Sequence, residues 1–405
     1  MLQRYKNYPY QSIFCKACKS IIRKNRIFAV TKSITFMKLW AIIFFLLPIL
    51  GCIYAGWSVW RILPLATIWK IFVITAMIAS LMLLFVGFGI GLDKMPLPIA
   101  RIIYTIGTSS IFVLLYLVML FLVLHIGELV HLIPTSFMKS STAGSLTVLA
   151  IMLGIFTYAN INYNNKVRVP INLQTNTTLQ KPLTIVMLSD LHLGYHNPRK
   201  ELAQWVDIVN AEHPDLILIA GDIIDKSVRP LIEENMAQEF KRLNAPIYAC
   251  LGNHEYFSGE PRAQQFYKEA GIHLLRDSSV TLPQFGNLTI IGRDDRTNRH
   301  RKSIKQLMQE VHQPVTYTIL LDHQPYDLEL SEQAGIDFQL SGHTHYGQVW
   351  PISWIEDAMY ENAYGPSQRG KTQFYVTSGI GIWGGKFRIG TQSEYVVAHL
   401  EPSSK

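Results

Sequence analysis

Four long runs of apolar residues fill the first part of this 405-residue chain, and they constrain its fold more than any other feature. A segment that crosses the hydrocarbon core of a bilayer needs about 20 apolar residues. In lipid the backbone must satisfy its own hydrogen bonds, which favours helices. No Asp, Glu, Lys or Arg interrupts the runs. They predict about four transmembrane helices that serve as an anchor, over residues 39–60, 71–92, 102–126 and 145–161.

The distribution of charge predicts how these helices are oriented. Residues 1–38 carry nine basic residues and no acidic one, whereas the whole chain has a net charge of +8. Lys and Arg in short segments beside membrane spans mark the cytoplasmic side. The basic tail therefore predicts an inner (cell) membrane protein with several spans and a cytoplasmic second half. If residues 145–161 did not cross the membrane, that half would face outward. The charge predicts membrane lipids as partners and no nucleic acid.

The second half of the chain has the pattern of a globular α/β domain. Residues 162–181, rich in Asn, Thr and Lys, are expected to form a linker, and the domain is expected over residues 182–405. Short apolar runs of strand length, such as 183–189, 216–220, 247–251 and 317–321, alternate with helical patterns, such as 198–212 and 230–243. This alternation is typical of buried sheets covered by helices.

Five short motifs rich in Asp, His and Asn follow these strand-like runs. A single Asp or His at a strand end is usually a turn or cap residue. Side chains one residue apart on an extended end point the same way, so Asp190 and His192, or His343 and His345, can bind one cation together. Carboxylate, imidazole and amide ligands suit Mn, Fe or Zn better than Ca. The motifs are Ser189-Asp190-Leu191-His192, Gly221-Asp222-Ile223-Ile224-Asp225, Gly252-Asn253-His254-Glu255, Asp322-His323 and Gly342-His343-Thr344-His345.

In this order the five motifs resemble the signature of the calcineurin-like metallophosphoesterase superfamily. The resemblance covers about residues 182–400 and implies a four-layer α/β/β/α sandwich that binds two divalent metal ions. It implies that Asp222 bridges the ions and that His254 faces the phosphate. The first ion would be bound by Asp190, His192, Asp222 and His345, and the second by Asp222, Asn253, His323 and His343.

The end of the last motif is similar to one bacterial branch of that superfamily. Residues Gly342–Gln348 match the G-H-T-H-G-G-Q of membrane-attached phosphodiesterases, except that Tyr346 replaces a glycine. Residues Gly292–Asp295 also resemble the G-x-D-D of that branch. A bulky ring at position 346 can narrow the site.

The resemblance implies a phosphoesterase that cleaves a phosphodiester or pyrophosphate bond. Two cations would generate hydroxide near neutral pH, and His254 would donate a proton to the leaving oxygen. Asp225 would either orient His254 or simply begin a helix. Attachment to a membrane favours a lipid-linked substrate such as UDP-diacylglucosamine. The alternatives are soluble nucleotides as substrates, or a membrane scaffold without catalytic activity.

Several residues outside the motifs have two interpretations. Arg388 could contact an anionic substrate or be a surface cation after a turn. Trp350, Trp354 and Trp383 could line an apolar groove or fill a core. His196 is expected to be a surface or packing residue.

Overall fold

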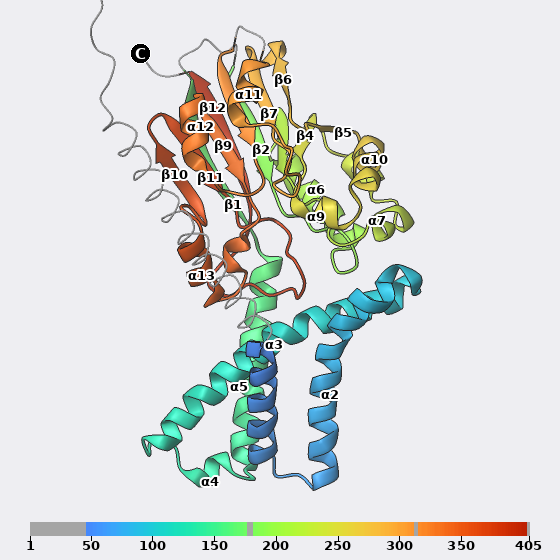
Figure 1. The fold of residues 1–405 in the computed structure, drawn as a ribbon, viewed down its shortest axis with the longest axis vertical. Coiled ribbons are helices and arrows are strands. Elements are labelled where there is room, and N and C mark those ends of the chain that lie inside the picture. Colours follow the sequence, from blue (N-terminus) through green and yellow to red (C-terminus); the bar gives the residue numbers. More distant parts are fainter. Residues whose placement is uncertain (1–45, 176–180, 312–314, 403–405) are drawn as a thin grey trace, which may run out of the picture. The chain divides into compact units, whose positions relative to one another are not determined.

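The computed structural model describes residues 46–175, 181–311 and 315–402 (Figure 1). The basic tail predicted over residues 1–38 therefore lies outside the described residues. By its internal contacts the chain divides into two compact units. One unit comprises Met1–Lys70 and Leu117–Thr142, and the other comprises Ile71–Tyr116 and Ala143–Lys405.

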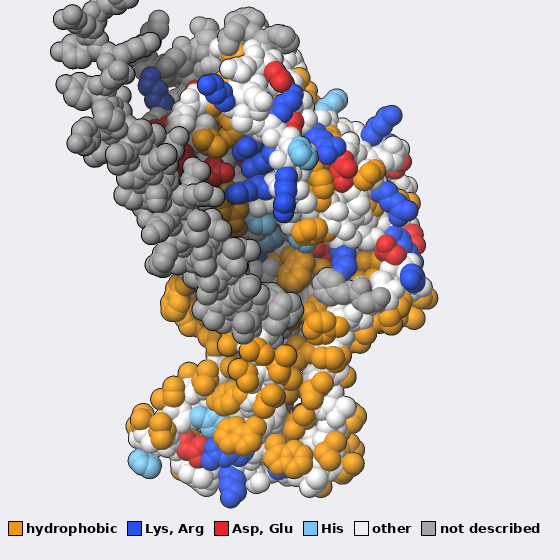
Figure 2. Space-filling model, in the orientation of Figure 1, with side chains coloured by type: hydrophobic (Ala, Val, Ile, Leu, Met, Phe, Trp, Pro, Cys, Tyr) orange, Lys and Arg blue, Asp and Glu red, His pale blue; other side chains and the backbone are white. Residues whose placement is uncertain are grey.

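Within the described ranges, three helices are long and apolar enough to cross a membrane. They are α2 (Thr67–Val86), α3 (Leu97–Leu129) and α5 (Thr142–Asn164), and they overlap the predicted runs 71–92, 102–126 and 145–161. A further apolar helix, Leu46–Ile62, begins where the described residues begin, inside the predicted run 39–60. Figure 2 shows that hydrophobic side chains dominate the visible surface of the helical part. A π turn (Gly87–Gly91), a 3-10 turn (Leu92–Lys94) and α4 (Thr135–Met138) connect these helices.

Polar contacts inside the first unit join residues near the helix ends. Arg61 donates to both carboxylate oxygens of Glu128, at 2.7 and 2.5 Å. The Arg61 carbonyl accepts from the backbone N–H of Ser140 at 2.9 Å. Paired charges at the ends of apolar helices agree with the absence of charges in their interiors.

Two six-stranded sheets form the centre of the second unit. Most of their inner strands are short and largely buried, and β3 (Leu-Ile-Leu-Ile-Ala) is buried at every position. The order in the first sheet is β1 (Lys166–Thr175), β12 (Ser393–Pro402), β2 (Leu183–Leu188), β3 (Leu216–Ala220), β4 (Ile247–Cys250) and β5 (Ile272–Leu274). The order in the second is β10 (Gly365–Arg369), β11 (Thr372–Val376), β9 (Phe338–Ser341), β8 (Tyr317–Leu321), β7 (Leu288–Gly292) and β6 (Ser278–Leu282).

The sheets and helices stack in four layers, which confirms the predicted α/β/β/α class. Side chains such as Leu218 and Ile290 fill the space between the two sheets. Helices α6 (Arg199–Ala211), α8 (Ala237–Phe240) and α10 (Glu260–Ala270) pack on the outer face of the first sheet. On the outer face of the second sheet α11 (Ile304–Gln309) packs through Leu307, and α12 (Leu328–Ala334) adjoins this core through Ala334.

The linker prediction is wrong for residues 166–175. This segment is strand β1, which pairs in parallel with β12 along its whole length. The polar composition concealed an alternating pattern, in which Val167, Val169, Ile171 and Leu173 occupy every second position. Strand geometry turns such alternate residues to one face, and Leu173 there joins the core between the sheets.

The single helix predicted over residues 230–243 is also wrong. The structure has two short helices, α7 (Arg229–Glu233) and α8 (Ala237–Phe240), with Asn235 between them at φ 54°. A left-handed residue cannot continue a right-handed helix, so the chain turns there.

Substitutions in β1 distinguish a strand from a linker. We expect Leu173→Ala to destabilise the protein by about 2–5 kcal/mol because it leaves a cavity between the sheets. Asn172→Ala, at the neighbouring exposed position, should change stability by less than about 0.5 kcal/mol. Thermal unfolding of the detergent-solubilised chain, followed by tryptophan fluorescence, compares the two. Equal melting temperatures for both variants would contradict a structural role for β1.

Candidate metal centre

The residues of the five motifs lie at the carboxyl ends of neighbouring strands. Asp190 and His192 follow β2, Asp222 follows β3, and Asn253 follows β4, three strands that run parallel. In the second sheet His323 follows β8, and the Gly342–His345 motif follows the parallel strand β9. Parallel strands bring such loops to one edge of each sheet. All nine site residues predicted from the sequence are brought together there.

Most of these side chains come from backbone in an unfavourable conformation. A non-glycine residue with positive φ costs on the order of 1–3 kcal/mol and is frequent at functional sites. Neighbouring structure must hold such residues in place. The positive φ values occur at Asp190, His192, Asp222, His343 and His345.

A first group of ligand atoms comes from Asp190, His192 and His345. Each offers one atom, and the three atoms lie within 4.8 Å of one another. The Nε2 atoms of His192 and His345 are 3.0 Å apart. Asp190 Oδ1 lies 3.7 Å from the first of these nitrogens and 3.5 Å from the second.

A second group comes from Asp222, His323 and His343, whose ligand atoms meet the same limit. His323 Nε2 lies 3.1 Å from Asp222 Oδ2 and 3.2 Å from Asn253 Oδ1. Asp222 Oδ2 is also 3.7 Å from His192 Nε2 in the first group. One carboxylate oxygen therefore lies between the two groups.

The arrangement of protons fits a cation site. His323 Nδ1 donates to the Ala220 carbonyl at 2.7 Å, so its Nε2 lone pair faces two oxygens that are also acceptors. This second contact is what fixes the tautomer of a metal-binding histidine. Among the described residues the buried Nδ1 atom of His345 has no hydrogen-bond partner, and that of His192 lies 3.4 Å from Asp225 Oδ1. Carboxylate, imidazole and amide groups that converge in this way form a donor set suited to divalent cations.

The charges of the site act strongly on its histidines. Burial lowers the pKa of His192, but its contacts with Asp190 and Asp225 outweigh burial and raise that pKa to about 10. Burial, together with the charge of His323, lowers the pKa of His343 to about 4. The carboxylates around His192 therefore favour positive charge there, as they would favour a bound cation.

His254 lies at the edge of the site, beside Asp225. Its Nδ1 is 3.1 Å from the backbone carbonyl of Asp225 and 3.3 Å from Oδ1 of the same residue. A carbonyl only accepts, so Nδ1 carries the proton and Nε2 is left for other contacts. Burial lowers the pKa of His254, but the charges of Asp222 and Asp225 outweigh it and raise that pKa above its usual value.

Glu255 and two glycines form the support for the site, and no role for them follows from the motif pattern alone. The buried Glu255 carboxylate accepts from the backbone N–H groups of Asp222, Ile224 and Gly252, at 3.1, 3.0 and 2.7 Å. A Cβ at Gly252 would collide with the Asp222 carboxylate, and one at Gly342 with Asp190. Glycine is needed at both positions because carboxylates approach the backbone so closely.

Arg388 is neither a substrate contact nor a surface cation, so both interpretations of it are wrong. Its side chain is buried and donates to the carbonyls of His345, Ser378 and Gly381, at 2.8, 2.5 and 3.0 Å. Burial lowers its pKa to about 10. Arg388 fixes the loop that carries His345, and only tertiary contacts reveal this role.

The tryptophans and Tyr346 lie at the surface around the last motif. Trp350 and Trp354 are exposed and do not fill the core of the sandwich, whereas Trp383 is half-buried. The Tyr346 ring stacks on Tyr364 with centroids 4.9 Å apart.

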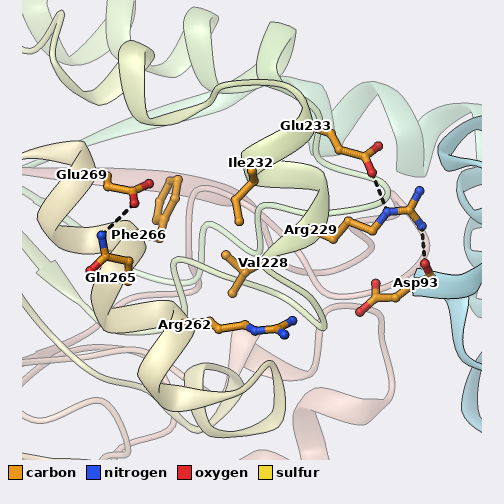
Figure 3. Close-up of a pocket in the computed structure, with 9 residues that line it drawn as sticks. All are labelled: Asp93, Val228, Arg229, Ile232, Glu233, Arg262, Gln265, Phe266 and Glu269. Atoms are coloured by element: carbon orange, nitrogen blue, oxygen red, sulfur yellow. Dashed lines mark hydrogen bonds and ion pairs between the residues drawn. The ribbon is translucent and has the colours of Figure 1, made fainter.

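A pocket of about 510 Å³ lies apart from these ligands (Figure 3). None of the nine site residues lines it. Its walls come from α7, α10 and Asp93, and Arg229 links Glu233 to Asp93 along one side.

The chain is similar in sequence to known metallophosphoesterases. Residues 183–347 match the sequence profile of the calcineurin-like phosphoesterases. The chain is 32% identical to an uncharacterised metallophosphoesterase of Campylobacter jejuni over 64% of this chain and 69% of that protein. It is 31% identical to a transmembrane protein with a metallophosphoesterase domain from Danio rerio, over 52% of each. A 5'-nucleotidase precursor from Thermus thermophilus shares 18% identity over 54% of each chain, with a TM-score of 0.34.

Proposed function

Because this chain belongs to the calcineurin-like phosphoesterase family and is a metal-dependent hydrolase, we propose that it cleaves a phosphodiester or pyrophosphate bond while anchored in a membrane. The observation that carries the proposal is the position of Asp222 Oδ2 between two groups of ligand atoms. One cation would be held by Asp190, His192, Asp222 and His345, and a second by Asp222, Asn253, His323 and His343. When bound, two such cations acidify a water molecule and offset the charge of the phosphate.

His254 is suited to protonate the leaving oxygen. The Asp225 carbonyl holds the protonated Nδ1, and the side chain retains partial exposure at the edge of the site. Its Nε2 therefore remains available to a substrate. Asp225 acts as the residue that positions this ring, and a proton donor placed in this way contributes about 10²–10⁴-fold to rate.

An exposed apolar helix beside the site supports a lipid-linked substrate. In α13 (Ile352–Met359) Trp354 is 64%, Ile355 45% and Met359 58% exposed. This helix contacts the last metal motif, because the Tyr346 hydroxyl donates to Asp357 at 3.3 Å. Exposed apolar clusters of this kind mark membrane or partner contacts.

The segment that leads into α13 is also fastened to the apolar helix α5. Trp350 donates its backbone N–H to the Ile389 carbonyl at 2.7 Å. Asn162, near the end of α5, donates to the carbonyls of Arg388 and Thr391 at 3.0 and 2.8 Å. The loop before α13 is therefore joined, through the neighbouring residues 388–391, to a helix proposed to cross the membrane.

A substrate screen of the full-length chain in detergent micelles tests the function. We expect hydrolysis that needs added Mn²⁺, Fe²⁺ or Zn²⁺ and is lost with a chelator. Lipid pyrophosphates such as UDP-diacylglucosamine should be turned over faster than soluble nucleotides or bis-p-nitrophenyl phosphate.

Asn253→Ala should abolish metal-dependent turnover, because it removes an oxygen ligand of the second cation. Full activity of this variant with unchanged metal content would contradict the assignment.

Variants of α13 separate the two substrate classes within that screen. Trp354→Ser combined with Met359→Ser should reduce lipid turnover at least about tenfold more than turnover of the soluble diester, since burial of even one such side chain contributes about 1.5–3 kcal/mol and about 1.4 kcal/mol corresponds to tenfold. Ile232→Ser, at a similarly exposed apolar position on α7, is the matched control. A soluble nucleotide as the preferred substrate, with no effect of the α13 variant on that preference, would overturn the lipid assignment.

The proton-donor role of His254 predicts a dependence on the leaving group. His254→Ala should retain both metals and lose about 10²-fold or more in rate with poor leaving groups such as alkoxides. The loss should be much smaller for p-nitrophenolate, which leaves without protonation. Rates are compared across a series of substituted phenyl diesters with metal content measured in parallel. Equal losses along the series would argue against this role.

We also infer that the catalytic half faces the cytoplasm. The inference rests on the basic tail and on α5 as a last crossing. A reporter enzyme fused after residue 405 that works only when exported should remain inactive, whereas a cytoplasmic reporter at the same position should be active. The reverse result would place the catalytic half outside.

A further inference from the structure

A tyrosine of the long apolar helix α3 reaches the residue that organises the metal centre. The Tyr104 hydroxyl donates to Asp225 Oδ2 at 2.5 Å, and both side chains are buried. The two residues are 121 positions apart in the sequence. A bond of this kind, to an ionised acceptor, is stronger than one between neutral groups.

Asp225 connects this hydroxyl to two histidines of the site. Its Oδ1 lies 3.4 Å from His192 Nδ1 and 3.3 Å from His254 Nδ1. A carboxylate is planar, so a partner that fixes Oδ2 also fixes where Oδ1 points. The Tyr104 hydroxyl thereby determines how Asp225 faces a proposed metal ligand on one side and a proposed proton donor on the other.

The start of α3 and the turns before it are fastened to the same loops by further contacts. Asp93 accepts from Ser227 at 2.8 Å and from the Tyr195 hydroxyl. Arg229 donates to the carbonyl of Asp93 at 2.8 Å, as Figure 3 shows, and to that of Met95 at 2.7 Å. These bonds hold the loop after β3, which carries Asp222 and Asp225.

The first turns of α3 also pack against the domain. Arg101 pairs with Glu234 at 2.5 Å. The Tyr104 ring stacks on His196, whose own ring nitrogen lies 3.8 Å from Asp225 Oδ2. The hydroxyl therefore has a defined position and does not swing freely.

The length of α3 allows one helix both to cross a membrane and to contact the metal centre. Its 33 residues make it about 50 Å long, at 1.5 Å per residue. The hydrocarbon core of a bilayer is about 30 Å thick. Several turns can therefore extend beyond the core, and Tyr104 lies in the second turn after Leu97.

We propose that Tyr104 is a positioning residue of the metal centre, so that an apolar helix supplies part of the site. This inference rests on the proposed function, since Tyr104 acts through Asp225 on His192 and His254. It would make the helical region a component of catalysis and more than a tether. Nothing in the residue pattern around Tyr104 distinguishes it from Tyr116, the other tyrosine of the helix.

The test compares two tyrosines of α3 whose buried or partly buried hydroxyls each donate a hydrogen bond within the second unit. Tyr104→Phe removes the bond to Asp225 and keeps the ring on His196. Tyr116→Phe, the matched control, removes a bond of 2.5 Å to the carbonyl of Trp350.

In full-length protein we expect Tyr104→Phe to weaken Mn²⁺ binding about tenfold, the usual scale when a partner of a metal ligand is removed. The kcat should fall about 10- to 100-fold with KM within about twofold, because a hydrogen bond to a charged group is lost. Tyr116→Phe should change neither.

A double-mutant cycle shows whether Tyr104 acts through Asp225. Tyr104→Phe added to Asp225→Asn should have little further effect on Mn²⁺ affinity or kcat, because the partner is already altered. Additive losses would overturn the proposal, as would wild-type Mn²⁺ affinity in Tyr104→Phe. Calorimetric Mn²⁺ titration needs no substrate, so these outcomes are separate from failure of the proposed function. That failure would appear as a wild-type chain that binds Mn²⁺ but hydrolyses none of the phosphoesters in the screen.

Discussion

The structure depends on bringing many electron-rich atoms together around one buried carboxylate oxygen, Asp222 Oδ2. Carboxylates and unprotonated imidazoles repel one another unless positive charge lies between them. The chain meets this constraint with a donor set that suits divalent cations and with a rigid support. One part of that support is Glu255, which accepts hydrogen bonds from three backbone N–H groups. The other is Arg388, which donates to the backbone carbonyls of His345, Ser378 and Gly381.

Backbone strain at the site is compatible with stability because the layers below it are regular. The site loops with positive φ follow short, fully buried strands such as β3 and β9, which contribute side chains to the core between the sheets. Glycines at positions 252 and 342 allow carboxylates to touch the backbone. The cost of the unusual conformations is thus confined to the strand ends, where ligands are needed.

The helical region has a second role if α3 supplies a contact to Asp225. Attachment to a membrane then does more than raise the local concentration of a lipid substrate. The same helix would set the geometry of a carboxylate between two histidines, and α13 would present an apolar surface next to the last metal motif. Location and catalysis would be physically connected, since one continuous helix takes part in both.

The sequence was enough to predict the four layers and to place nine polar residues after recognisable apolar strands, where the structure brings them together. The sequence was not enough to predict that residues 166–175 form strand β1, because polar neighbours concealed the alternating Val, Ile and Leu. It also misled about Arg388, because a lone arginine after glycines has no local sign of burial.

What the sequence determined by itself was the chemistry: the residue types, their order and the helices long enough for a bilayer. These follow from spacing over a few residues. The tertiary structure decided which distant groups support that chemistry. Glu255 accepts from backbone N–H groups of two loops, Arg388 donates to the carbonyl of His345, and Tyr104 donates to Asp225. Such contacts join positions as far as 121 residues apart, and only folding brings their atoms within hydrogen-bonding distance.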